Sequence, residues 1–164
     1  MTEGRKDYLA QAIKYIDASY VHSKCTRLSV ACLAFPPYRP GFGLQHDKIA
    51  AGHNTAHKGN PEHADGLLHN CRDDGHLMID DHCVRTIHAE QLMLINAMHN
   101  GINIAGHSLA VSHTPCITCS ILIIEAGIKE IFIGAEYKPN PITFQWLTNA
   151  GIKVYDWNFN PIKW

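Results

Sequence analysis

The amino-acid sequence predicts an α/β fold of three layers, α/β/α, in which helices cover both faces of a five-stranded mixed sheet. Short β-branched runs alternate with helical runs through the second half of the chain, a pattern typical of βα units. Two further apolar runs in the first half indicate additional strands. The 164 residues suffice to bury one substantial core without repeats or linkers, so we expect a single domain spanning residues 1–164.

The first half of the chain predicts one helix and two strands. Residues 8–22 have helical spacing, with apolar side chains near the face that would pack on the sheet: Leu9, Ile13, Ile16 and Tyr20. Residues 27–35 form an apolar, β-branched run that indicates a buried strand. The segment 36–43, rich in proline and glycine, breaks this strand, and residues 47–53 return as a second one.

A polar segment follows at residues 54–84, rich in His, Gly, Asp and Cys and without clear periodicity. A loop of this length inside a compact domain is usually functional or held in place by other contacts. Its own residues suggest what holds it. Residues 88–98 then predict a helix, which ends at Asn100 and Gly101.

The last third of the chain predicts three strands that alternate with two helices. The strands are residues 108–112, 130–134 and 153–156. One helix covers residues 116–126, with Pro115 opening it where a missing N–H costs nothing, and it stops at Gly127. The other helix covers residues 142–150 and is capped by Gly151.

Three metal-ligating residues, one His and two Cys, stand at helix starts in a spacing that favours a catalytic zinc site. Cys116 and Cys119 are three residues apart, which puts both thiols on one helix face in the first turn, where the helix dipole favours thiolates. His88 stands at another helix start. One imidazole and two thiolates leave a tetrahedral zinc one ligand short, and catalytic sites keep that position for water. A lone C-x-x-C also suits a structural zinc knuckle or a redox pair.

Glu90 lies two positions after His88, and we expect it to move protons rather than bind metal. A zinc-bound hydroxide that attacks C4 of a cytosine ring needs N3 protonated and ammonia released, and one carboxylate can serve both steps. H-x-E followed by P-C-x-x-C is the signature of zinc-dependent deaminases. The simpler interpretation of Glu90 is a first-turn carboxylate that stabilises its helix.

Composition excludes several other classes of protein. The net charge of −1 and the absence of a long basic run argue against nucleic-acid binding by charge alone. No apolar segment predicts a signal peptide or a membrane span, so we expect a cytoplasmic protein. In a reducing compartment, six Cys mixed with twelve His favour metal sites over disulfides.

Beyond the zinc motifs, the chain resembles the deoxycytidylate (dCMP) deaminases of the cytidine-deaminase-like superfamily from about residue 23 to residue 157. The resemblance rests on three runs: Ser23-Lys24-Cys25-Thr26-Arg27, Asp81-His82-Cys83-Val84-Arg85-Thr86-Ile87-His88-Ala89-Glu90 and Ile124-Glu125-Ala126-Gly127-Ile128-Lys129. It implies conversion of dCMP to dUMP and ammonia by a homohexamer. It also implies activation by dCTP with Mg²⁺ and inhibition by dTTP.

The chain departs from the family pattern at two places that bear on substrate choice. Gly52-His53-Asn54-Thr55 replaces Gly-Tyr-Asn-Gly, which puts the effector site in doubt, while Asn54 keeps the position expected to bind the substrate sugar. Leu92-Met93 replaces Asn-Ala after H-A-E, as in other branches such as tRNA adenosine deaminases. The alternatives are therefore a deaminase of modified dCMP, cytidine, deoxycytidine or an RNA base, or a non-catalytic zinc or nucleotide-binding module.

The resemblance further implies a second, structural zinc held by Cys25, Cys71, His76 and Cys83, with His82 as a possible substitute. Four protein ligands would close this site and fix the 54–84 loop. The alternative is a set of reduced cysteines and solvated histidines. Cys32, in the middle of a strand, is expected to be a small core residue.

Substrate contacts are expected around the zinc motifs, at Asn54, Ala89, His113, Thr114, Pro115 and Tyr137. Tyr137 would stack on the pyrimidine or serve as a rim aromatic. His57 and Lys58 are candidates for a 5′-phosphate. The remaining histidines, among them His63 and His69, are expected mostly on the surface or in loops.

Overall fold

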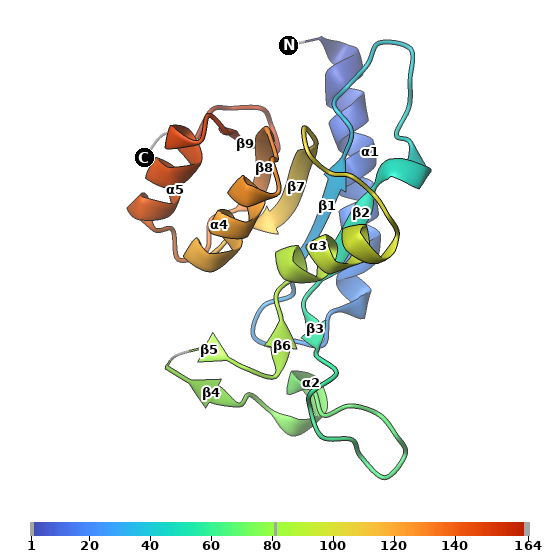
Figure 1. Cartoon of the computed structure of the whole chain (residues 1–164), viewed down its shortest axis with the longest axis vertical. Coiled ribbons are helices and arrows are strands. Elements are labelled where there is room, and N and C mark those ends of the chain that lie inside the picture. The colour runs from blue at the N-terminus through green and yellow to red at the C-terminus, as the bar shows by residue number, and fades with distance from the viewer. Residues whose placement is uncertain (1, 81, 163–164) are drawn as a thin grey trace.

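The computed structural model describes residues 2–80 and 82–162, without the side chain of His82. Five strands form the central sheet (Figure 1): β1 Ala31–Phe35, β2 Ala50–His53, β7 Ser108–His113, β8 Glu130–Ala135 and β9 Lys153–Asp156. Their order across the sheet is β2-β1-β7-β8-β9. β1 is antiparallel to both of its neighbours, whereas β7, β8 and β9 are parallel to one another. The predicted five-stranded mixed sheet is confirmed.

The longer helices cover both faces of this sheet: α1 Glu3–Ser19, α3 Ala89–His99, α4 Ile117–Glu125 and α5 Pro141–Asn149. α1 packs on one face, and the other three pack on the opposite face, which gives the predicted three layers. Single 3₁₀ turns at Tyr20–His22 and His46–Lys48 flank the first two strands. None of the helices in the described part of the chain is both long and apolar enough to cross a membrane.

The burial of β1 on both faces of the sheet explains its continuous apolar sequence. All five of its residues are buried, because alternate side chains face the two helical layers. Leu33 and Phe35 join a cluster with Ile16 of α1, whereas Cys32 joins a cluster with Met93 of α3. Cys32 is therefore a core residue, as expected, and burial raises the pKa of its thiol.

The polar segment between β2 and α3 contains short elements: β3 Thr55–Ala56, α2 Cys71–Asp74, β4 Met78–Ile79, β5 His82–Cys83 and β6 Thr86–Ile87. β3 pairs with β6 at the base of the segment, and β4 pairs with β5 in a hairpin. Figure 1 shows these elements grouped together at one end of the sheet. The segment thus has its own ordered arrangement beside the main core.

Two predicted element starts differ from the structure for local reasons. α1 begins at Glu3 rather than near residue 8, because its first turn faces solvent and carries no apolar periodicity. β1 begins at Ala31 rather than residue 27. Before it, the Val30 N–H and the Leu28 carbonyl are hydrogen-bonded to the side chain of Asn54 instead of to a strand.

The start of α4 also differs from the prediction. Cys116 is the residue that caps this helix, and its Sγ accepts a hydrogen bond from the Cys119 N–H at 3.5 Å. Pro115 therefore lies one residue before the cap rather than at the first helical position. The consequence is that the thiol of Cys116 is turned back over the helix N-terminus.

Candidate active site

The starts of α3 and α4 meet beside the end of β7. His88 caps α3, and Cys116 caps α4. The position of α3 depends on Gly52 of β2, where a methyl group would lie 2.0 Å from the backbone oxygen of Ala89 and 2.5 Å from the backbone nitrogen of Met93. Only glycine allows this close approach, which fixes the first turn of α3 against the sheet.

The three predicted ligands of the catalytic zinc lie together. His88 Nδ1 is 3.6 Å from Cys116 Sγ and 3.4 Å from Cys119 Sγ. Tetrahedral zinc with ordinary Zn–N and Zn–S bonds needs an N···S separation of about 3.5 Å. His88, Cys116 and Cys119 therefore fit a zinc ion in both chemistry and spacing, and they supply three ligands rather than four.

The two sulfur atoms have opposite acid–base behaviour. The hydrogen bond from Cys119 is the largest effect on Cys116 and, together with His88, lowers the pKa of Cys116 to about 4 despite burial. The hydrogen bond with Cys116 and burial raise the pKa of Cys119. The pair thus holds one proton, which a cation bound to both thiolates would displace. The hydrogen bond with Cys116 also raises the pKa of His88.

Glu90 is only 4% exposed, although it is a carboxylic acid. Burial is the main cause that raises its pKa, while its own backbone N–H and His88 oppose this effect. The side chain is within hydrogen-bonding reach of the Cys119 thiol. A buried carboxyl group with a raised pKa beside a metal-binding triad is suited to accept and return a proton.

A cavity of about 350 Å³ opens over this group. His88, Glu90 and Cys116 line it. The predicted substrate contacts line it as well: Asn54, Ala89, His113, Thr114, Pro115 and Tyr137. The structure therefore brings these residues, from four separate parts of the chain, to the wall of one cavity.

Asn54 is buried at this wall, and hydrogen bonds within the protein occupy most of its side-chain amide. Its Oδ1 accepts hydrogen bonds from Ser23 Oγ at 2.6 Å and from the Val30 N–H at 2.9 Å, while its Nδ2 donates to the Leu28 carbonyl at 2.7 Å. An amide nitrogen has two hydrogens, so one donor is left for a ligand in the cavity.

Another part of the cavity wall is formed by the end of β7 and by residues that follow β7 and β8. The rings of His113 and Tyr137 meet edge to face with centroids 6.3 Å apart. The Tyr137 N–H donates to Thr114 Oγ1 at 3.3 Å, and the Thr114 N–H donates to the Ala135 carbonyl at 3.1 Å. Burial lowers the pKa of His113, which favours a neutral imidazole at neutral pH.

Sequence reasoning missed two cations of the cavity wall, Arg27 and Lys138. Arg27 belongs to one of the runs that carry the family resemblance, which was the available signal, whereas Lys138 follows Tyr137 in a loop without any pattern. His57 and Lys58 are absent from the described lining of the cavity. The His57 ring is instead bound to the Val84 carbonyl at 2.8 Å and to the Gly59 N–H at 3.1 Å.

The predicted ligands of a second zinc also lie together, at one rim of the cavity. The donor atoms of Cys25, Cys71 and His76 lie within 4.8 Å of one another, and Cys71 Sγ is 3.3 Å from Cys83 Sγ. His76 Nδ1 is buried and has no hydrogen-bond partner in the described part of the chain, as expected of a nitrogen meant for a metal. Cys83 lies beside Cys71 but outside the group of three donor atoms that are all within 4.8 Å of one another, so Cys25, Cys71 and His76 are the close ligands and Cys83 is the nearby candidate for the fourth position of a closed site. The side chain of His82, the suggested substitute, lies outside the described residues.

The protonation of these thiols fits the same interpretation. Burial and a hydrogen bond with Cys83 raise the pKa of Cys71 to about 12. Burial would also raise the pKa of Cys83, but the neighbouring His76, Cys71 and backbone groups outweigh it and lower that pKa to about 7. The cluster thus contains a thiol that ionises readily near neutral pH, which is the form that binds metal.

Comparisons with known proteins agree with this geometry. The family model of the cytidine and deoxycytidylate deaminase zinc-binding region matches residues 2–135. ComE operon protein 2 of Bacillus subtilis (strain 168) is 38% identical over 136 residues, which cover 82% of this chain and 62% of that protein. The deoxycytidylate deaminase of Saccharomyces cerevisiae is 29% identical over 143 residues, which cover 84% of this chain and 40% of that protein. The chain thus spans less than two thirds of the length of these curated relatives.

Solved structures show the same fold. The dCMP deaminase from the cyanophage S-TIM5 in apo form superposes with a TM-score of 0.63 at 22% identity, over 95% of this chain and 99% of that chain. Its structure in complex with dCMP and dUMP gives a TM-score of 0.61 at 24% identity, over 95% and 98% of the two chains. The cytidine-deaminase-like fold is therefore confirmed. Because the family model matches most of the chain, including the H-A-E and P-C-x-x-C motifs, this protein belongs to the cytidine and deoxycytidylate deaminase family.

Proposed function

We propose that this protein is a zinc-dependent hydrolase that deaminates dCMP to dUMP and ammonia. The observation that carries the proposal is a buried carboxyl group, Glu90, beside a triad of metal ligands at the wall of a cavity. The cavity has the size of a small-molecule site and combines apolar walls with a few polar groups. The relatives named above as deoxycytidylate deaminases support the choice of substrate.

In this proposal the chain's own residues divide the work. His88, Cys116 and Cys119 hold the zinc, which, when bound, supplies a Lewis acid that activates water at neutral pH. Glu90 takes one proton from the attacking water and delivers it to N3 of the cytosine ring; it then takes a second proton from the new C4 hydroxyl and delivers it to the amino group, which leaves as ammonia as the C4 carbonyl forms. Burial of Glu90 keeps each proton away from bulk solvent while the carboxyl group holds it.

The remaining lining residues would bind the nucleotide. The free amide hydrogen of Asn54 would donate to the sugar, and the pair formed by His113 and Tyr137 would lie against the base. Arg27 and Lys138 would neutralise the 5′-phosphate, because they are the cations of the described lining. These two cations favour a nucleotide over a nucleoside.

The test is release of ammonia from dCMP by the zinc-loaded protein and by Glu90→Gln. We expect turnover by the wild type and a loss of about 10²- to 10⁴-fold in the variant, the usual contribution of a positioned acid–base group. Zinc content per chain must be equal in both. The matched control is Glu125→Gln at the exposed end of α4, which should keep wild-type turnover. Equal turnover in Glu90→Gln would reject the role of this carboxylate.

A substrate panel tests the choice of dCMP. dCMP, deoxycytidine, cytidine and a single-stranded RNA are compared at equal concentrations, with and without dCTP and Mg²⁺ or dTTP. We expect the highest kcat/KM with dCMP. A higher kcat/KM with a nucleoside or with RNA would reject dCMP as the preferred substrate. The absence of turnover with every pyrimidine tested would favour a non-catalytic binding module. Sedimentation of the same sample tests the homohexamer that the family resemblance predicts.

A further inference from the structure

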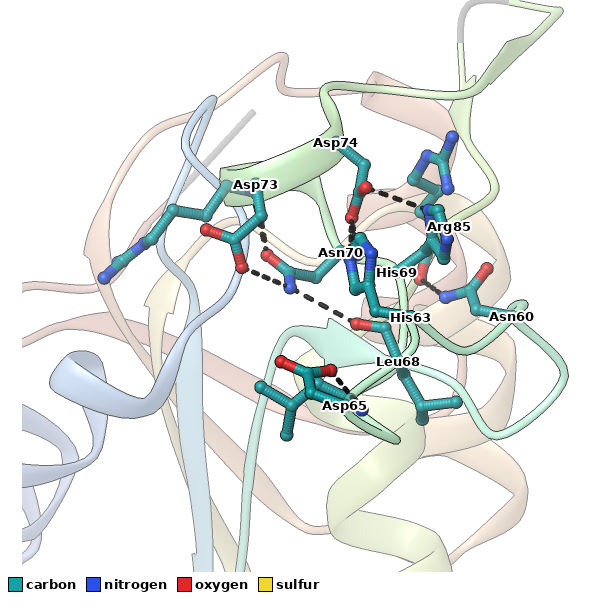
Figure 2. Close-up of polar contacts among 11 residues, drawn as sticks. Asn60, His63, Asp65, Leu68, His69, Asn70, Asp73, Asp74 and Arg85 are labelled. Atoms are coloured by element: carbon teal, nitrogen blue, oxygen red, sulfur yellow. Dashed lines mark hydrogen bonds and ion pairs between the residues drawn. The ribbon is translucent and has the colours of Figure 1, made fainter.

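A third group of metal-ligating side chains lies outside both cysteine-containing sites. It consists of His63 and His69, from the loop that follows β3, and Asp74 at the end of α2 (Figure 2). His63 Nε2 is 3.1 Å from one carboxylate oxygen of Asp74, and His69 Nδ1 is 2.9 Å from the other. The two imidazole rings are nearly parallel, with centroids 4.0 Å apart and an interplanar angle of 15°.

The backbone holds these three side chains in place. The loop folds back on itself through hydrogen bonds from the His63 N–H to the Leu67 carbonyl at 2.8 Å and from the Gly66 N–H to the His63 carbonyl at 2.9 Å. The His69 N–H donates to the Pro61 carbonyl at 2.9 Å, which sets the two histidines on one side of the turn. We refer to residues 61–69 as the histidine loop.

Asp74 is fixed independently of the histidines. Its Oδ2 accepts a hydrogen bond from the Asn70 N–H at 2.8 Å (Figure 2). The side chain of Asp74 is 13% exposed, whereas the side chains of His63 and His69 are 35% and 29% exposed. The carboxylate is thus the least exposed member of a partly buried group, and the imidazoles leave one side of the group open to solvent.

Without a metal, both ring nitrogens that face Asp74 must carry hydrogens, so His69 is either an Nδ1–H tautomer or an imidazolium. If both rings were protonated, two like charges would be stacked with their centroids 4.0 Å apart. A cation would instead accept the lone pairs of His63 Nε2 and His69 Nδ1 together with the carboxylate, and both rings would stay neutral. All three donor atoms already lie within 4.8 Å of one another.

We propose that His63, His69 and Asp74 form a third metal site that binds a divalent transition metal and fastens the histidine loop to α2. Two imidazoles and one carboxylate suit Zn²⁺, Co²⁺ or Ni²⁺ rather than Mg²⁺ or Ca²⁺, which prefer oxygen ligands. Water would complete the coordination on the open side. With three protein ligands and no thiolate, this site binds metal more weakly than the two cysteine-containing sites.

The experiment titrates the full-length protein with Co²⁺ after both cysteine-containing sites have been loaded with Zn²⁺. Cobalt bound to nitrogen and oxygen shows visible d–d bands, and cobalt bound to thiolate adds a sulfur-to-metal charge-transfer band. We expect one further equivalent of Co²⁺ with d–d bands and no charge-transfer band. His63→Ala and Asp74→Asn should weaken its binding more than about tenfold, since even loss of a group that only orients a ligand costs that much.

Asp74→Asn keeps the oxygen that accepts the Asn70 N–H, so the local fold is retained. The matched control is His99→Ala at the exposed end of α3, which should bind Co²⁺ as the wild type does. An unchanged content of two zinc ions in every variant shows that the fold and the other sites are intact. The proposal is rejected if the wild type binds no additional Co²⁺, or if His63→Ala and Asp74→Asn bind Co²⁺ as tightly as the wild type does. The group would then be a hydrogen-bonded contact without a metal. A charge-transfer band would mean that cobalt had entered a thiolate site and would equally overturn the proposal. None of these readouts depends on deaminase activity.

Discussion

Substitution of Gly52 by alanine tests whether close packing of α3 on β2 sets the catalytic geometry. The added methyl group would lie 2.0 Å from the Ala89 carbonyl oxygen. To restore an ordinary contact, the first turn of α3 must retreat by about 1.4 Å, because close-packed backbone on both sides offers no other space. That turn carries His88 and Glu90. Overpacking of this kind costs about 1–3 kcal/mol, and a backbone clash belongs at the upper end of that range.

For a chain of this size, about 3 kcal/mol lowers Tm by roughly 6–12 °C. A displacement near 1 Å of a catalytic group costs about 100-fold in rate, so kcat/KM for dCMP should fall by that factor at temperatures where the variant is folded. Calorimetry and ammonia release measure the two effects. The matched control is Gly43→Ala, whose methyl group would meet only Gln11 Oε1, at 3.8 Å. If Gly52→Ala and Gly43→Ala unfold at the same temperature and react equally fast, the link between this contact and the site is refuted.

Three further predictions concern the proposed phosphate contact, the proposed second zinc site and the apolar core. Arg27→Ala should raise KM for dCMP about 10- to 100-fold, as expected for the loss of a hydrogen bond to a charged group, and leave deoxycytidine unaffected; a parallel loss with both substrates would contradict a phosphate contact. Cys71→Ser should reduce the zinc content by one per chain and lower Tm, since each hundredfold excess of zinc over Kd contributes about 2.7 kcal/mol; unchanged metal analysis would remove Cys71 from the ligands. Met93→Ala should destabilise the protein by about 2–5 kcal/mol in denaturant unfolding, whereas Met98→Ala, on the exposed side of the same helix, should change stability by less than about 0.5 kcal/mol.

The strands and long helices of this fold could be predicted because their buried faces require apolar residues at a regular spacing along the sequence. β1 is buried on both faces and therefore reads as an unbroken apolar run. The elements of the polar segment could not be predicted, because they depend on distant partners. β3 pairs with β6 across the whole segment, and neither strand exceeds two residues. Local propensity carries no signal at that length.

The predicted metal ligands could likewise be recognised from the sequence, whereas two residues of the cavity wall could not. The spacing of Cys116 and Cys119 within one helical turn predicted a shared face, and the structure brings both sulfurs to His88. Arg27 and Lys138 carry no such periodicity, because they reach the cavity from irregular segments. A single charged residue in a loop becomes informative only after the fold has set its neighbours.

The pairing of β3 with β6 has a consequence for how the family can diversify. It joins Thr55 to Ile87 and Ala56 to Thr86, so the excursion between them leaves and re-enters the body of the protein at one point. Once such ends are pinned, doubling the length of the intervening chain costs only about 0.6 kcal/mol of closure entropy. Insertions and deletions can therefore accumulate between β3 and β6, and this segment can gain or lose metal-ligating residues. The packing of α3, which carries Glu90, on the sheet would not change.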